Sequence, residues 1–379
     1  MKNIFVLLLT LCGIVGILVY PEVSCDSAEQ AIEMCLTVLV PTLFPFLVLS
    51  GIFIKCGFAE RLGRLLDRFT KKVFCVGGNC SSAMILGLVS GFPIGAKTVS
   101  SLYKNGACSK VEAERTLAFC NNAGPSFILG TVGVGIWQSG KTGWLLWAVQ
   151  IVSAVFVGII VGRIWKGTAD TVVFVNTKNN IPQKQSVLHI FLSSVTDSAV
   201  SMLYICSFVV FFAVAVSLLL HTGLIPSISA AICKLFPFFE RETVENLLVG
   251  IFEMTTGVSR VGNSAPVLQN LAVTSALIGW AGISVHCQVL SYICDGGLSP
   301  KPYFIGKILQ TAFATALIFI CSFLIPGYKA DILPSSEIPQ ISVYALVCGA
   351  VVAFSLTVLF LLFRSKKQTE KTVKFSRKP

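Results

Sequence analysis

Long apolar segments, several of them interrupted by glycine and proline, constrain this 379-residue chain more than any other feature. Several of them reach about 20 residues, the length that an α-helix needs to cross the hydrocarbon core of a bilayer. Hydrophobic residues make up 54% of the chain and charged residues only 12%, whereas a soluble domain carries roughly 25% charged residues. The sequence therefore predicts an all-α polytopic membrane protein in a lipid bilayer, with about eight transmembrane helices and two re-entrant hairpins.

The excess of positive charge fits the same class. The net charge is +11, from 29 basic and 18 acidic residues. The basic residues gather in short polar segments such as 55–72 and in the C-terminal tail. This is the positive-inside pattern of membrane proteins. No nucleic-acid-binding motif is visible, so we expect no nucleic-acid partner.

Two runs place proline and glycine where an apolar helix should continue. They are Ser90-Gly91-Phe92-Pro93-Ile94-Gly95-Ala96-Lys97 and Cys120-Asn121-Asn122-Ala123-Gly124-Pro125-Ser126. Proline lacks a backbone donor and its ring excludes the carbonyl four residues back, so the carbonyls of Val89 and Asn121 lose their helical partners. In hydrocarbon such a group needs protein or a water-filled cavity to satisfy it. Packing kinks rich in small residues are the alternative explanation.

The order of segments divides the chain into two similar halves. Each half has one span, then a glycine-bearing stretch predicted to be re-entrant, then two further spans. Three crossings per unit require the second copy to be inverted. The predicted boundaries are an N-terminal transmembrane helix at 1–25, a first repeat at 26–165, a cytoplasmic linker at 166–193, a second repeat at 194–328, a last transmembrane helix at 329–364 and a basic cytoplasmic tail at 365–379.

The two halves also align weakly in sequence. Residues 123–127 align with 281–285, and residues 56–58 align with 222–224. Inverted repeats with paired broken segments are typical of secondary transporters, whose binding site lies at the repeat interface. The pattern therefore favours a transporter over a set of unrelated kinks.

Three charged residues near the breaks are candidates for the site. Glu253 lies deep in an apolar segment, where a carboxylate is costly and often functional. It could instead cap a helix N-terminus. Lys97 and Arg260 follow the glycine-rich turns of the two halves, and the alternative for both is anchoring at the membrane surface by snorkelling.

Other patterns give no site. The run 135–142 matches the phosphate-binding pattern G-x-x-x-x-G-K-[ST], but that loop needs a strand before it. We interpret it as a tight external turn. The 14 cysteines lack metal-ligand spacing, and no catalytic constellation appears. We therefore expect that the protein is not an enzyme and binds no cofactor or metal. The sequence leaves open whether it forms a homo-oligomer.

The broken runs 90–97 and 120–127, together with Glu253-Met254-Thr255-Thr256-Gly257, resemble the YlbJ-type sporulation integral membrane proteins, the stage V dipicolinate transporters of spore-forming bacteria. These are members of the wider nucleoside-recognition, or Gate-domain, membrane proteins. The resemblance covers roughly residues 29–326. It implies export of dipicolinic acid from the mother cell across the outer forespore membrane, and a fold related to concentrative nucleoside carriers. A nucleoside or other metabolite carrier, or a non-transporting sporulation membrane scaffold, is the alternative.

An anionic substrate in a dry site needs opposite charge or several hydrogen-bond donors. Broken helices offer backbone N–H groups at a positive helix end. The predicted substrate-binding residues are Ser90, Pro93, Gly95, Lys97, Asn121, Asn122, Gly124, Pro125, Ser126, Glu253, Thr255, Thr256 and Arg260.

Overall fold

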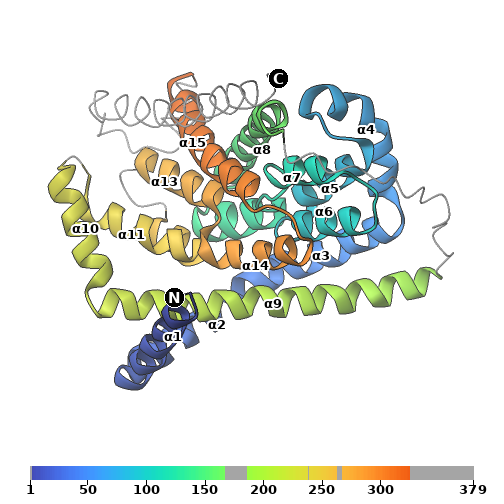
Figure 1. Ribbon diagram of the computed structural model, residues 1–379. Coiled ribbons are helices and arrows are strands. Elements are labelled where there is room, and N and C mark those ends of the chain that lie inside the picture. The colour runs from blue at the N-terminus through green and yellow to red at the C-terminus, as the bar shows by residue number, and fades with distance from the viewer. Residues whose placement is uncertain (1, 167–185, 238, 263–266, 325–379) are drawn as a thin grey trace, which may run out of the picture.

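The computed structural model describes residues 2–166, 186–237, 239–262 and 267–324, and within these ranges every regular element is a helix (Figure 1). The elements are α1 (Lys2–Val19), α2 (Pro21–Met34), the π-helix η1 (Cys35–Leu39), α3 (Val40–Lys55), α4 (Phe58–Phe74), α5 (Gly78–Ser90), α6 (Ile94–Lys104), α7 (Lys110–Leu117), the π-helix η2 (Ser126–Ile136), α8 (Gly140–Ile164), α9 (Val187–His221), α10 (Leu224–Leu235), α11 (Arg241–Phe252), α12 (Met254–Val261), α13 (Val267–Trp280), α14 (Gly282–Asp295) and α15 (Lys301–Leu324).

Five helices in the described residues are long and apolar enough to cross a membrane, or six if one bent pair counts as a single span. The prediction of an all-α protein with several membrane-spanning helices is confirmed for the described residues. The predicted last span and the basic tail lie outside the described residues, as does most of the predicted linker.

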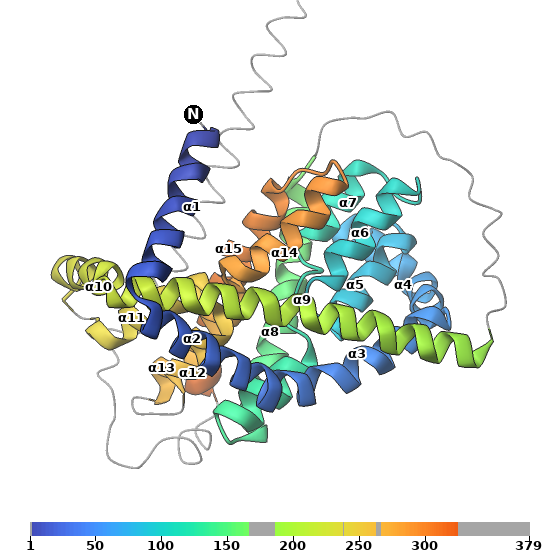
Figure 2. The same cartoon turned by 90° about the horizontal axis from the view of Figure 1, so that it is seen from below.

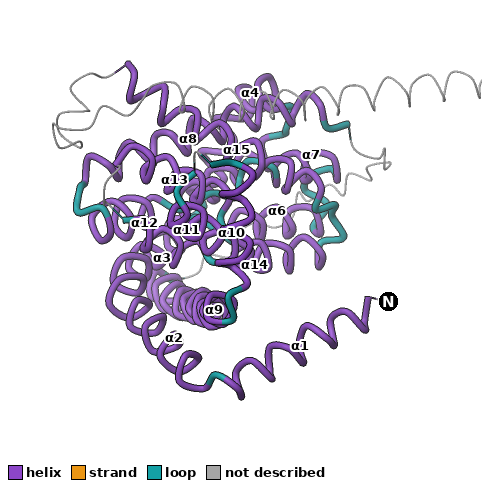
Figure 3. The backbone as a smooth tube through the Cα atoms, turned by 90° about the vertical axis from the view of Figure 1, so that its left-hand side faces the viewer, coloured by secondary structure: helices purple, strands orange, loops and turns teal. Residues whose placement is uncertain are grey.

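Two long helices pack against each other along one side of the molecule (Figures 1 and 2). One is the continuous helix Pro21–Lys55, made of α2, η1 and α3, and the other is α9; each has 35 residues. A helix of this length extends about 50 Å, more than the ~30 Å hydrocarbon core, so both must tilt or emerge from it. Helix α1 projects away from this pair (Figure 3).

The contacts between the two long helices show that they run antiparallel. Tyr20, just before the first, makes an edge-to-face contact with His221 at the end of the second, with ring centroids 4.7 Å apart. At the other end, Lys55 forms an ion pair with Asp197 at 2.7 Å. The first long helix starts with the acidic segment of α2, and α9 begins at Val187, within the range 166–193 predicted as a linker.

The same glycine corner follows each long helix. Gly57 and Gly223 have φ of 73° and 77°, in the left-handed region that glycine adopts without penalty. Each turns the chain into a shorter helix, α4 or α10. The residues aligned between the halves in the sequence therefore occupy equivalent positions in the order of elements.

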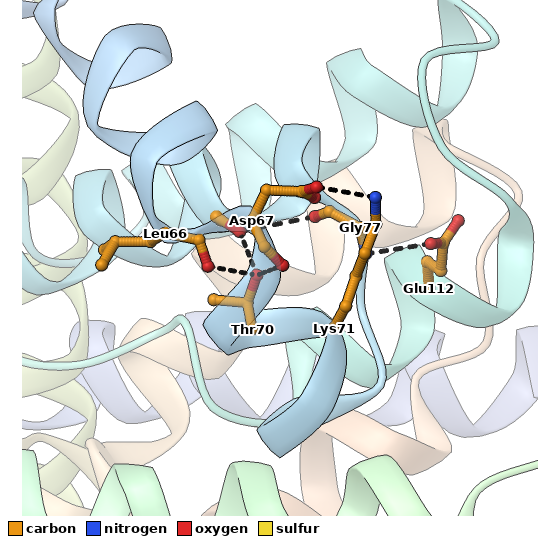
Figure 4. A network of polar contacts seen from close by, with 7 residues as sticks. Leu66, Asp67, Thr70, Lys71, Gly77 and Glu112 are labelled. Atoms are coloured by element: carbon orange, nitrogen blue, oxygen red, sulfur yellow. Dashed lines mark hydrogen bonds and ion pairs between the residues drawn. The ribbon is translucent and has the colours of Figure 1, made fainter.

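The corner between α4 and α5 bends the chain by 92° between Leu65–Phe74 and Gly78–Ser90. Figure 4 shows the polar contacts around it, which involve Leu66, Asp67, Thr70, Lys71, Gly77 and Glu112. The Thr70 hydroxyl lies 2.5 Å from that of Ser81 across the corner. Glu112 of α7 accepts a hydrogen bond from the Gly77 N–H at 2.9 Å. These contacts fix the start of α5 and so the position of its far end, where the first break lies.

Candidate functional site

The two breaks of the first half are in direct backbone contact. Helix α5 ends at Ser90, and α6 begins at Ile94 after Gly91, whose φ is 76°. Helix α7 ends at Leu117 and the chain is irregular until η2 begins. A Cβ added to Gly91 would lie 2.6 Å from the backbone nitrogen of Gly124. Glycine is thus required for the two breaks to meet.

Two further glycines strengthen this contact. A Cβ on Gly87 or Gly95 would overlap the carbonyl oxygen of Cys120. Gly87 is on α5 and Gly95 on α6, so the two helices and the irregular segment after α7 approach one another at backbone distance.

The second half repeats the arrangement with different residues. Helix α11 ends at Phe252, Glu253 is extended, and α12 follows. Helix α13 gives way to α14 at Ala281, whose φ is 81°. A Cβ on Gly282 would lie 2.9 Å from the backbone nitrogen of Met254. The break between α11 and α12 therefore touches the break between α13 and α14.

A cavity of about 60 Å³ lies where these four breaks converge. Three of the breaks and the first turns of α14, just after the fourth, contribute to its wall, and the long helices Pro21–Lys55 and α9 add apolar side chains. The lining residues are Leu39, Leu43, Leu47, Ser90, Gly91, Phe92, Gly124, Ser126, Phe127, Ile205, Val209, Glu253, Met254, Thr255, Ser284, Val285 and Gln288.

Glu253 is the acidic residue on this wall, and it is only 1% exposed. Its carboxylate accepts the backbone N–H groups of Thr255 at 3.0 Å and Thr256 at 2.5 Å, so it caps the N-terminus of α12. The sequence suggested two roles for Glu253, a functional carboxylate or a helix cap. In the structure the side chain caps α12 and also faces the cavity.

A fully buried cation, Lys307 of α15, completes the first-half break. It is 1% exposed. Its ammonium donates to the carbonyl oxygen of Asn121 at 3.2 Å and to Gln310 Oε1 at 2.9 Å. The Asn121 carbonyl is the one that Pro125 deprives of a helical partner. The acceptor that the sequence predicted to be freed is therefore satisfied by a lysine from the other half of the chain.

The network continues through side-chain amides. Gln310 donates to Asn122 Oδ1 at 2.6 Å and to Gln150 Oε1 at 3.2 Å. Gln150 in turn donates to the Ser275 carbonyl at 2.9 Å. Gln150 is on α8 and Gln310 on α15, the last described helices of the two halves. The network thus ties the two halves together beside the breaks.

Two hydroxyls that line the cavity have no hydrogen-bond partner among the described residues. They are Ser90 Oγ, from the first half, and Ser284 Oγ, from the second. Ser90 is 7% exposed and Ser284 1%. Unsatisfied buried hydroxyls are rare in proteins, so this pair is available to a water or a solute in the cavity.

The structure distributes the predicted site residues unevenly. Those that line the cavity are Ser90, Gly124, Ser126, Glu253 and Thr255. Those that support it from behind are Pro93, Gly95, Asn121, Asn122, Pro125 and Thr256: Pro93 and Pro125 precede helices α6 and η2, Gly95 contacts Cys120, and Thr256 bonds to Glu253. Asn121 anchors α6 by accepting the Ala96 N–H at 2.8 Å.

Two predicted residues, Lys97 and Arg260, lie away from this cavity. Lys97 is exposed on α6 and does not line the cavity, because the first turn of α6 directs the neighbouring Ala96 inward instead. Arg260 is exposed as well and donates from Nε to Asn246 Oδ1 at 3.0 Å. The sequence analysis missed Lys307, Gln310 and Gln150. Their signal was a lysine and a glutamine three residues apart within one apolar span, matched by a glutamine in the corresponding span of the other half.

The discounted motifs have structural roles. The run matching the phosphate-binding pattern joins η2 to α8, so helix and not strand precedes it, and the Ser139 hydroxyl caps α8 by accepting the Thr142 N–H at 3.2 Å. Over the described ranges, every cysteine is free and no cluster of His, Cys, Asp and Glu could hold a metal ion.

Comparison with known proteins agrees with the motifs. Residues 36–121 match the Gate family, described as nucleoside recognition. The chain is 28% identical over 318 residues to the sporulation integral membrane protein YlbJ of Bacillus subtilis (strain 168), with 79% of this chain and 78% of that protein covered. No solved structure matches significantly. The resemblance inferred from the broken runs is thus confirmed: this is an integral membrane protein that matches the Gate family over residues 36–121 and is similar along most of its length to a sporulation membrane protein.

Proposed function

We propose that this protein is a secondary transporter of a small organic anion, and that the cavity between the four breaks is its substrate site. The observation that carries the proposal is the convergence of the four broken segments on one cavity. Irregular backbone at membrane depth survives only inside protein or around a cavity. A scaffold protein has no need of two matched pairs of broken helices that meet at one point.

The proposal includes an inverted repeat with about eight spans and two re-entrant hairpins. Its support is the antiparallel packing of the two long helices, which occupy the same position in each half. The glycine corners at Gly57 and Gly223 and the aligned breaks at residues 123–127 and 281–285 add to it. In such transporters the site lies between the repeats and opens alternately to each side.

The cavity volume bears on the transport cycle. About 60 Å³ is well below the ~150 Å³ of a cavity that holds benzene, so an aromatic dicarboxylate does not fit the cavity as it stands. We propose that this is a closed state and that substrate entry requires the breaks to separate.

The substrate that we propose is dipicolinic acid, exported from the mother cell toward the forespore across the outer forespore membrane. The similarity to a sporulation membrane protein supports the cellular setting. The buried ammonium of Lys307 and the free hydroxyls of Ser90 and Ser284 suit an anion with several acceptor oxygens.

A nucleoside carrier is the second candidate. The match of residues 36–121 to a family described as nucleoside recognition favours it. Side-chain amides such as Gln288, which lines the cavity, would suit the hydroxyl and amide groups of a nucleoside.

Uptake into proteoliposomes separates these candidates. The purified full chain is reconstituted, and entry of labelled dipicolinate and of labelled nucleosides is compared with protein-free vesicles. We expect saturable entry of dipicolinate that excess unlabelled dipicolinate inhibits. Saturable nucleoside entry alone would favour the second candidate, and no protein-dependent entry of either would favour a scaffold.

A further inference from the structure

The ring of Phe92 contacts both the cavity and the buried ammonium of Lys307. Phe92 belongs to the first-half break and lines the cavity. The Lys307 Nζ lies 5.5 Å from the centroid of its ring, in a cation–π contact. Lys307 itself does not line the cavity. One aromatic side chain therefore covers the ammonium on the side where the cavity lies.

The ammonium of Lys307 has more hydrogen-bond donors than it has acceptors among the described residues. A lysine carries three N–H donors. Within the described residues, Lys307 directs hydrogen bonds to two acceptors, the Asn121 carbonyl and Gln310 Oε1. No carboxylate among those residues pairs with it. A buried ammonium held only by neutral acceptors and a ring is electrostatically incomplete.

The partners of Lys307 are fixed in a way that keeps the donor in place. Gln310 is itself locked by its bonds to Asn122 and Gln150, so its oxygen must face the lysine. The ring of Phe92, in contrast, projects from a turn between helices, at a half-buried position. Of the groups around the ammonium, the Phe92 ring is held by apolar packing and not by a hydrogen bond, so its movement would break none.

We propose that Lys307 is the counter-ion of the transported anion, and that the Phe92 ring covers its ammonium in the closed state and moves away when the anion binds. This inference rests on the proposed function and adds to it a selectivity for carboxylates over neutral solutes. When Phe92 turns away, the third N–H of Lys307 meets a carboxylate of the substrate. A neutral solute gains no such bond, so the site discriminates for carboxylates.

The test uses two ligands of one shape and different charge, pyridine-2,6-dicarboxylate and the neutral pyridine-2,6-dicarboxamide. Their binding to the full chain is measured by calorimetry for the wild type, Lys307→Gln and Phe92→Leu. Lys301→Gln is the matched control, because Lys301 is an exposed lysine on the same helix. Glutamine keeps a polar side chain at 307, and leucine keeps an apolar side chain without an aromatic ring at 92.

We expect Lys307→Gln to weaken dicarboxylate binding by roughly ten- to a hundredfold, as expected for losing one hydrogen bond to a charged group, and to leave diamide binding within about threefold. Phe92→Leu should tighten dicarboxylate binding by roughly threefold to thirtyfold, since the ring no longer competes for the ammonium. The control should retain wild-type affinity for both ligands.

Equal weakening of both ligands by Lys307→Gln would show a purely structural lysine and overturn the inference. If Phe92→Leu has the same ratio of dicarboxylate affinity to dicarboxamide affinity as the wild type, the inference is also overturned. This comparison decides the question if Lys307→Gln does not fold. If proteoliposomes move nucleosides but not the dicarboxylate, the inference fails while transport stands. If no solute is moved, the proposed function fails with it.

Discussion

The two halves of the molecule build the same broken-helix junction with opposite charges. In the first half, the carbonyl oxygen of Asn121 accepts a hydrogen bond from the ammonium of Lys307. In the second half, the backbone N–H groups at the start of α12 donate to the carboxylate of Glu253. One junction thus exposes a backbone acceptor to a cation, and the other exposes backbone donors to an anion.

The origin of the charged groups differs as well. Glu253 is local to its junction, whereas Lys307 comes from α15 of the other half. Glu253 faces the cavity directly, while Lys307 is covered by Phe92. The comparison teaches that the second junction can form from its own residues, but the first needs both halves to be folded together.

Glycine substitutions should break the junctions with the largest effect. Gly87→Ala would drive a methyl group into the Cys120 carbonyl, and Gly257→Ala would drive one into Gly250. Neither neighbour is a flexible side chain, so we expect each change to cost about 3 kcal/mol or more and to reduce the yield of folded protein. Gly140→Ala, with open space around the new methyl group, is the control. Fluorescence-detected gel filtration and thermal unfolding in detergent measure the effect, and normal elution of both variants would refute the backbone contacts.

Removing the carboxylate should have the next largest effect. Glu253→Ala leaves two buried N–H groups without their acceptor, and we expect about 2–4 kcal/mol of destabilisation at 1–3 kcal/mol for such a group. Glu253→Gln keeps an acceptor oxygen and should lose about half as much. Thermal unfolding in detergent ranks the two variants. Equal loss in both would mean that the charge, and not the cap, holds the second junction.

Truncating an amide of the first junction should have a smaller effect. Asn122→Ala removes the acceptor of the 2.6 Å bond from Gln310, which still bonds to Gln150. We expect about 0.5–1.5 kcal/mol of lost stability, together with weaker substrate binding because Gln310 no longer holds Lys307 as firmly. Binding measured beside unfolding tests this order. A loss as large as that of Glu253→Ala would show that Asn122 supports the site more directly than its contacts indicate.

The sequence predicted the breaks better than the charges around them. Proline and glycine act through local backbone geometry, so the junctions near Pro93 and Pro125 and the freed carbonyl of Asn121 follow from the chain itself. Which lysine approaches that carbonyl depends on how helices rotate against one another. Lys97 is close in sequence yet exposed, whereas Lys307 is 186 residues from Asn121 and bonded to it. Periodicity within α6 or α15 alone does not reveal this choice.

Two exposed or loop lysines should therefore have the smallest effects. We expect Lys97→Ala and Lys141→Ala each to change transport by less than about twofold, the range of most surface substitutions. Initial uptake rates at matched protein levels measure this. A loss with Lys97→Ala comparable to that of Lys307→Gln would restore Lys97 to the site, and a loss with Lys141→Ala would revive the phosphate-binding interpretation of its loop.

Protection of cysteines in the cavity tests the central claim most directly. Ser90→Cys and Ser284→Cys, in a background without other cysteines, place one thiol on the cavity wall from each half. We predict that a transported substrate slows alkylation of both thiols by a membrane-permeant maleimide at the concentration that half-saturates transport, and that a thiol at Gly140 is unaffected. Unchanged alkylation of both cavity thiols at saturating substrate, in protein that transports it, would contradict the assignment of this cavity as the substrate site.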